Sequence, residues 1–417
     1  GQNKTNYKAI FGAYDYKSVM RLKTFNWDKT DLVVYYDTKE SNGYRQFSGF
    51  KNKTINLKVS HRFSEKSNLV YQLNSTNSPY AYDSGGLTIE EVKLDRTSAR
   101  QRNIDYKTKE TVKHLKTGLS WSLDINDRAN IQSFAFFQHR DFYSLLPFGF
   151  GGIISLDKDV FGFGSRLQNK KTQNNYINTF QLGFDYSNQK DRRDRYRNNS
   201  GEEGENVFSQ LEKFSSFGLY VLNQAEFENG VLLRLGSRFD SNKIGTDNMN
   251  ESIILNKLNP SIGITYNTNN KSNVFITVGT SFETPTLNEL SNNPTGGMGF
   301  NKDLEPISSL SYEYGWKGNF NNSSLEIIGY NILSTNEILP YELEEYPGKN
   351  FYRNVGETSR SGLELSWNYF FSSASLQLSY AISDNKFKSY EINDSQLKGK
   401  KIPGIPNQLF DLSVLFK

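Results

Sequence analysis

The stretch that decides the fold starts at Ser281 with SFETPTLNEL and ends at Leu365 with YRNVGETSRSGLEL. Between these pieces lie NKDLEPISSLSYEYGWKG (Asn301–Gly318) and LEIIGYNILSTNEILPYE (Leu325–Glu342). In the first of these, every second residue from Leu310 to Trp316 is large and apolar, and polar or small residues stand between them. Since side chains alternate between the two faces of a β-strand, one face of this strand suits hydrocarbon and the other suits water.

The same apolar/polar alternation recurs along the chain. The clearest runs are Ile55–Val59, Leu115–Leu123, Phe180–Tyr186, Val231–Leu235, Leu363–Phe371 and Leu376–Ile382. No stretch shows a convincing helical period. The pattern predicts about eighteen strands, with boundaries accurate to about two to four residues. The first is expected near Thr5–Tyr14 and the last at Leu409–Phe416.

The connections between these runs fall into two alternating sets. The short set is Trp27–Thr30, Phe63–Ser67, Asn126–Asn130, Glu228–Gly230, Asn267–Asn273 and Asn319–Ser324. The long set is Asn77–Lys107, Tyr143–Gly152, Asn188–Asn206, Ser241–Asn256, Glu283–Ile307, Asn336–Asn350 and Asp384–Pro406. Such sorting is typical of an up-and-down transmembrane β-barrel with short periplasmic turns and long outer loops, and a soluble sandwich has no reason for it.

Composition agrees with this class. The 417 residues are 36% hydrophobic and 14% aromatic, with a mean hydropathy of -0.66. A helical membrane span needs about 18 consecutive apolar residues, and no such run occurs. A spanning strand needs only about 9–11 residues with one apolar face, and aromatic girdles are usual at both interfaces. The net charge of +4 is small and mixed, so it indicates no nucleic-acid partner.

The pieces between Ser281 and Leu365 resemble the later barrel strands of TonB-dependent outer-membrane receptors. Asn42–Arg45 (NGYR) and Asp83–Thr88 (DSGGLT) resemble two earlier loops of that family. The resemblance implies an all-β, antiparallel transmembrane barrel in the bacterial outer membrane. It also implies import of siderophores or other scarce nutrients, with energy from an inner-membrane TonB complex that grips a plug domain.

Barrels of this type close at about 22 strands around a plugged lumen, which exceeds the number expected here. We therefore expect residues 1–417 to form one partial barrel domain that lacks the plug and the last strands. We expect a curved, open sheet with a gap between Thr5–Tyr14 and Leu409–Phe416. An edge left open in hydrocarbon would leave backbone groups without hydrogen bonds.

Catalytic chemistry is scarce. The histidines, His61, His114 and His139, are far apart, and no nucleophile, phosphate-loop or zinc-ligand spacing is present. We expect no enzyme activity, no resident cofactor and no metal site. Phe148–Gly152 and Phe161–Gly164 mix Gly with Phe, and we interpret them as loop-base or bulge positions.

The most charged stretch, KDRRDRYR at Lys190–Arg197, has two interpretations. It is either a solvated outer loop with self-compensating charge, or an anion trap whose arginines bind the oxygens of a chelate. The candidate ligand residues are Arg192, Arg193, Arg195 and Tyr196 in this stretch, with Tyr44, Arg45, His139, Arg140 and Tyr143 at other outer ends.

The resemblance also bears on the ligand. Haem receptors of the family usually carry a His between two motifs that match Phe282–Pro285 and Asn301–Leu304, and none stands there. We expect a polar or anionic metal chelate, a ferric siderophore above all, carried by a monomer in contact with outer-membrane lipid. The alternatives are a passive porin, an adhesin or surface-binding barrel, and a soluble β-repeat protein. A porin would conduct ions as purified, an adhesin would bind a macromolecule, and a soluble β-repeat protein would purify without detergent.

Overall fold

A computed structural model describes residues 3–249, 252–269, 271–297, 299–345, 349–392 and 395–416. The strands of the first half are β1 (Lys4–Gly12), β2 (Tyr16–Trp27), β3 (Thr30–Ser41), β4 (Phe50–Ser64), β5 (Ser67–Tyr82), β6 (Lys109–Asn126), β7 (Ala129–Leu145), β8 (Ile153–Thr172), β9 (Tyr176–Asn199) and β10 (Glu202–Phe227). Those of the second half are β11 (Val231–Thr246), β12 (Ile253–Asn269), β13 (Ser272–Glu283), β14 (Ile307–Phe320), β15 (Ser323–Glu342), β16 (Asn350–Phe370), β17 (Ala374–Ser389), β18 (Glu391–Ile392), β19 (Ser395–Gln396) and β20 (Gln408–Phe416). All but β18 and β19, which pair with each other, belong to one 18-stranded sheet. The predicted all-β class and strand number are confirmed.

The chain divides into two compact units. The first unit comprises Gly1–Leu167, Phe184–Phe217 and Asn242–Ile254. The second unit comprises Gln168–Gly183, Gly218–Ser241 and Leu255–Lys417. Since β1 lies in the first unit and β20 in the second, the expected gap between the first and last strands stays a prediction.

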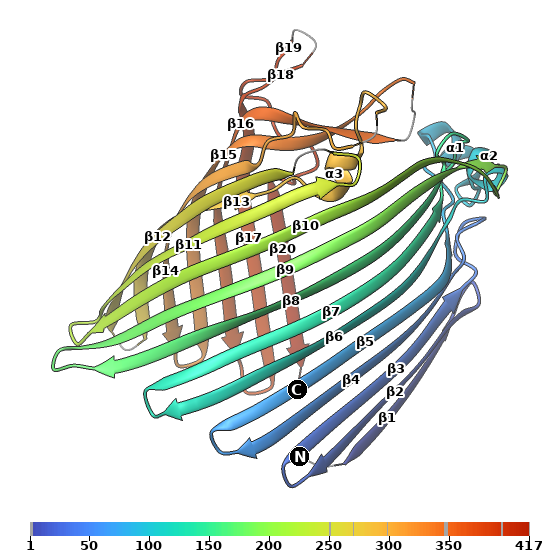
Figure 1. Ribbon diagram of the computed structural model, residues 1–417. Coiled ribbons are helices and arrows are strands. Elements are labelled where there is room, and N and C mark those ends of the chain that lie inside the picture. The colour runs from blue at the N-terminus through green and yellow to red at the C-terminus, as the bar shows by residue number, and fades with distance from the viewer. Residues whose placement is uncertain are drawn as a thin grey trace. The chain divides into compact units, whose positions relative to one another are not determined.

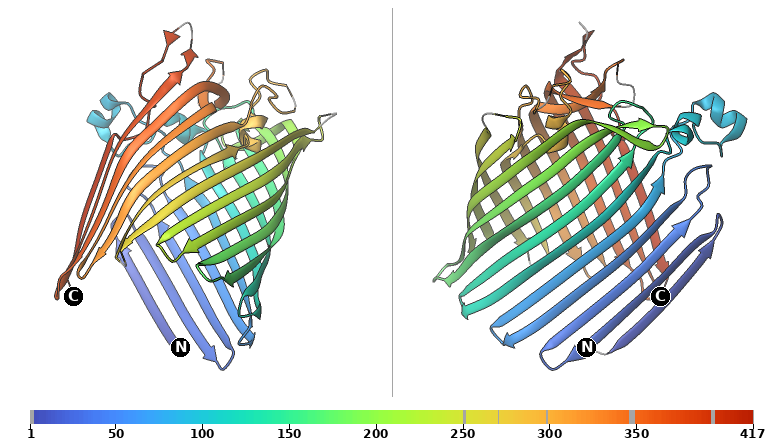
Figure 2. Two further views of the ribbon diagram at one scale, coloured as in Figure 1. Left: turned by 90° about the vertical axis from the view of Figure 1, so that its left-hand side faces the viewer. Right: turned by 45° about the vertical axis from the view of Figure 1, so that its right-hand side comes forward.

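Short turns and longer connections alternate along much of the chain as predicted, but not around β9 and β10. In the first unit, tight turns join β2 to β3, β4 to β5 and β6 to β7 at one end of the strands, and the long β5–β6 connection lies at the other end (Figure 1). In the second unit, the left view of Figure 2 shows β14–β17 and β20 side by side, with the β18–β19 ribbon beyond the end of β17.

Some predicted loops are strands. The expected connector Asn188–Asn206 is wrong, because β9 and β10 continue through it and meet at Ser200 and Gly201. These two residues have φ of 51° and 90°, and left-handed values at both central positions suit a two-residue hairpin turn. Strand structure also covers part of the expected connectors Ser241–Asn256 and Asn336–Asn350. Strands that continue beyond a membrane keep the period of two but not the apolar side chains that mark it.

In the part of the chain that the structure describes, the long connections contain three short helices where no helix is predicted, α1 (Ile89–Asp95), α2 (Gln101–Asp105) and α3 (Leu287–Ser291). Two of them begin with a capping box, Thr88 with Glu91 and Thr286 with Glu289. This Thr-x-x-Glu spacing was the available signal, but each helix is too short to show a period. Within the described residues, no helix has the length and apolar character needed to cross a membrane.

Cross-strand register gives each unit an apolar face and a polar face, because residues opposite each other in a ladder point to the same side. On the apolar face of the first unit the opposed pairs include Leu57 and Leu73, Tyr71 and Leu119, Leu69 and Trp121, and Thr117 and Phe137. On the apolar face of the second unit, the opposed pairs include Trp316 and Ile327, Ile327 and Leu365, Leu365 and Tyr380, Trp367 and Leu378, and Leu378 and Leu412. Ser366 lies opposite Ser379 on the other face, so the predicted two-faced strand is confirmed.

Glycines inside β8 make room for aromatic rings of β7. A Cβ atom on Gly162 would lie 2.6 Å from Cε1 of Phe136, and one on Gly164 would lie 2.8 Å from Cε1 of Phe134. Phe161–Gly164 lies inside β8, so its interpretation as a loop base is wrong, and its interpretation as a bulge stays a prediction. Phe148–Gly152 does lie in the connection between β7 and β8.

Closely packed apolar side chains lie at the end of the second unit's strands away from the short turns. Val355 of β16, Phe387 of β17 and Ile402 form a buried cluster, against which Leu339 and Tyr390 pack. This cluster anchors the long connection between β17 and β20 on the strands beneath it.

Candidate functional site

Strand alternation separates the predicted ligand residues into two groups. On β7, His139 and Tyr143 lie on the apolar-face side, and Arg140 lies on the polar face. On β9, burial alternates residue by residue from Asp191 to Arg195, with Arg193 and Arg195 buried on the polar face. Arg192 and Tyr196 point to the opposite side. The expected anion trap therefore does not bring its arginines together on one surface.

Arg45 fastens two loops to each other. Its Nη1 donates to the Gly85 carbonyl at 2.7 Å, and its Nε donates to the Ser98 carbonyl at 3.0 Å. Nη2 donates to the carbonyls of Ser98 and Ser84. The guanidinium is thus used for structure. The neighbouring Tyr44 is 43% exposed, with its ring centroid 5.6 Å from that of Tyr14, so it offers an aromatic surface.

Two buried ion pairs hold the extended part of β9. Arg193 donates from Nε to Glu212 Oε1 at 2.6 Å and from Nη2 to Oε2 at 3.2 Å. Lys158 of β8 lies 3.3 Å from Asp191, and burial raises the pKa of the Asp191 carboxyl. Burial, aided by the charge of Arg193, lowers the pKa of Arg195 to about 10. The charges of Arg193 and Glu212 are therefore paired with each other, and loss of one would leave the other buried without that partner.

The other residues of this stretch have surface contacts. Arg192 lies 3.8 Å from Asp247, and its side chain is 48% exposed. Tyr143 donates from its hydroxyl to Glu203 at 2.8 Å. Burial raises the pKa of Tyr143, and the Glu203 carboxylate acts in the same direction. Tyr143 and Tyr196 are therefore phenols on the side opposite the buried arginines.

A basic patch occupies the polar face of β6–β8. His114 lies opposite Arg140 in the β6–β7 register, and the charges of Lys116, Arg140 and Lys158 all act on its imidazole. The Arg140 guanidinium lies 5.2 Å from the Phe142 ring. Its Nε is buried and has no hydrogen-bond partner in the part of the chain that the structure describes. We define these residues, His114, Lys116, Arg140 and Lys158, as the basic patch. Of the predicted arginines, Arg140 is the one that lies within this patch.

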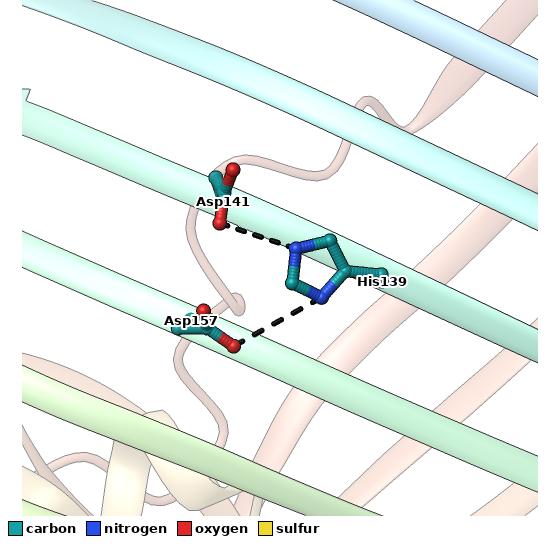
Figure 3. A group of neighbouring side chains, drawn as sticks. All are labelled: His139, Asp141 and Asp157. Carbon is teal, nitrogen blue, oxygen red and sulfur yellow. Dashed lines mark ion pairs between the residues drawn. The ribbon is translucent and has the colours of Figure 1, made fainter.

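A second group of titratable side chains lies on the other side of β7. His139 Nε2 lies 3.3 Å from Asp141, and Nδ1 lies 2.9 Å from Asp159 and 4.0 Å from Asp157. One ligand atom from each of His139, Asp141 and Asp157 can be chosen so that all lie within 4.8 Å of one another. Figure 3 shows the imidazole between the two carboxylates, which come from neighbouring strands. The sequence shows only the separate pairs H-x-D and D-x-D, so it did not reveal this cluster.

Long antiparallel strands in one sheet, with an apolar and a polar face, are typical of transmembrane β-barrel proteins. The family model for the TonB dependent receptor-like beta-barrel matches residues 2–416, and the chain belongs to this family. It is an outer-membrane protein, and its apolar face is the lipid-facing side.

Solved structures share this fold. The ferric citrate transporter FecA in its unliganded form superposes with a TM-score of 0.79 at 16% identity, covering 98% of this chain and 62% of the transporter. The siderophore receptor PiuA from Acinetobacter baumannii gives 0.76 at 14% identity, covering 100% of this chain and 70% of the receptor. The copper transporter OprC gives 0.71 at 12% identity, covering 92% and 61%. The chain thus spans less than two thirds of the ferric citrate transporter.

Proposed function

We propose that this protein imports an anionic metal chelate, a ferric siderophore, across the outer membrane with energy supplied through the TonB complex. The observation that carries the proposal is the basic patch, which lies on the face away from lipid. Membership of a transport-receptor family and the likeness to siderophore receptors support the same substrate class.

Arg140 is the proposed chelate contact. Its guanidinium lies on the polar face, opposite His114 in the β6–β7 register. A carboxylate or catecholate oxygen would accept from it, because the guanidinium fork matches planar oxygen pairs. Lys116 and His114 add donors beside it, whereas Arg193 is already paired with Glu212. We assign no contact with the chelate to Arg192, His139, Tyr143 or Tyr196, because they lie on the lipid side of their strands.

The test is uptake of labelled ferric siderophores by cells that have this protein as their sole receptor, with binding measured on isolated membranes. We expect Arg140→Gln to weaken binding about tenfold, as for the loss of one charge-assisted hydrogen bond, and to flatten its salt dependence. Arg192→Gln is the matched control, and its binding should equal that of the unmodified protein.

Other outcomes point elsewhere. Uptake that continues without TonB would indicate a passive porin. Equal binding by the Arg140 and Arg192 variants would remove the basic patch from the ligand site. Growth on haem would contradict the proposed ligand class.

A further inference from the structure

We propose that His139, Asp141 and Asp157, with Asp159 behind the imidazole, form a binding site for a divalent transition-metal ion such as Zn²⁺ on the outward side of the barrel wall. The site is independent of the transport proposal, because it lies on the face opposite the basic patch. It rests on the placement of residues in β7 and β8 of the first unit.

The position of the cluster follows from register. His139 lies opposite Leu115, and Phe137, two residues earlier, lies opposite Thr117 beside Leu119 on the apolar face. On β8, Asp159 stands two residues before Phe161 and therefore on the same face as Phe161 and Phe163, which are both 46% exposed.

The Phe161 ring centroid lies 6.2 Å from that of Tyr186. Aromatic residues of a transmembrane barrel gather at the two interfaces. Because the cluster lies one step beyond these rings, we infer that it stands at the level of the lipid head groups, where water and dissolved cations reach it.

The donor set selects the class of ion. One imidazole nitrogen with carboxylate oxygens suits Zn²⁺, whereas Ca²⁺ and Mg²⁺ prefer oxygen ligands throughout. Spacing also fits, since donor atoms of His139, Asp141 and Asp157 all lie within 4.8 Å of one another. An ion at about 2.0–2.2 Å from each donor would bind Nε2 beside Asp141, and the Asp157 side chain, now 4.0 Å from Nδ1, would turn toward it.

The contact between His139 and Asp159 is a separate indication. Asp159 Oδ1 lies 2.9 Å from Nδ1, which leaves Nε2 directed toward Asp141. A carboxylate on the far nitrogen of the ring is the usual support for a metal-binding histidine, because it fixes the tautomer and orients the ring. A cluster of carboxylates alone would not contain this arrangement.

Charge balance also favours a cation. Three carboxylates, those of Asp141, Asp157 and Asp159, lie around one imidazole. Even a protonated imidazole would neutralise only one of them. Lys113 lies opposite Asp141 in the β6–β7 register and is the positive group that competes with an ion. A divalent ion would relieve the remaining repulsion.

The experiment is calorimetric titration of Zn²⁺ into the full-length receptor, purified in detergent and freed of metal. We expect saturable binding of one ion, weakened about tenfold or more by His139→Gln and by the double change Asp141→Asn with Asp157→Asn. His114→Gln is the matched control, since this histidine lies on the polar face of the neighbouring strand.

Folding of each variant is checked by the heat-dependent gel mobility of the barrel. Absence of Zn²⁺ binding to the folded protein would overturn the proposal, as would an equal loss in the His139 and His114 variants. If the His139 variant fails to fold, the double Asn variant decides the question by the same titration. Siderophore uptake by the His139 variant should be unchanged, which separates this site from the transport function.

Discussion

The ladder between β16 and β17 and the extension of β9 and β10 use the same period of two for different purposes. In the first, Leu365 faces Tyr380 on the lipid side, and Ser366 faces Ser379 on the other. In the second, Arg193 is buried against Glu212, whereas the adjacent Arg192 is exposed. Alternation therefore decides which residues share a face, and position along the strand decides what surrounds that face.

The largest expected effect tests the buried side of the extension. Arg193→Ala would leave Glu212 buried without its Arg193 partner, and we expect a loss of about 3–5 kcal/mol in the free energy of unfolding. Urea unfolding in liposomes measures it. Arg192→Ala is the control, with an expected loss of at most about 1 kcal/mol because its ion pair is exposed. Similar losses for both arginines would contradict the contrast between the two faces.

The next effect tests the membrane ladder. Leu378→Arg places a charge on the lipid side and should cost about 2–4 kcal/mol, whereas Ser379→Arg on the polar face should cost far less. The same unfolding assay compares the two variants directly. Equal costs would show that the two faces of β17 do not meet lipid and water as proposed.

The smallest effect is a pH dependence at Asp191. Burial raises the pKa of this carboxyl in the folded protein, so the folded state binds its proton more tightly than the unfolded state does. Its contribution to stability is then fully present below the ordinary Asp pKa of about 3.9 and is lost as pH rises through the folded pKa.

Asp191→Asn isolates this contribution from those of Lys158 and Glu212, the charged groups that act on Asp191. We expect the stability difference between the unmodified protein and the variant to shift toward the variant as pH rises from about 4 to 7. A difference that is constant over this range would mean that the carboxyl titrates alike in both states.

The sequence by itself determined the strand class, the two faces and the sorting of the connections. Leu365 and Trp367 had to share a face with each other, and Trp27–Thr30 had to be a tight turn, because both patterns depend only on residues near in the chain. It also contained the family resemblance that the family model confirms.

Only the tertiary structure decided which strands lie beside each other and in what register. That register brings Asp157 and Asp159 of β8 to His139 of β7, and it places the Phe136 ring over Gly162. It also buries Arg193 while exposing Arg192. The physical reason is that burial and side-chain contact across strands depend on long-range pairing, which local alternation does not contain.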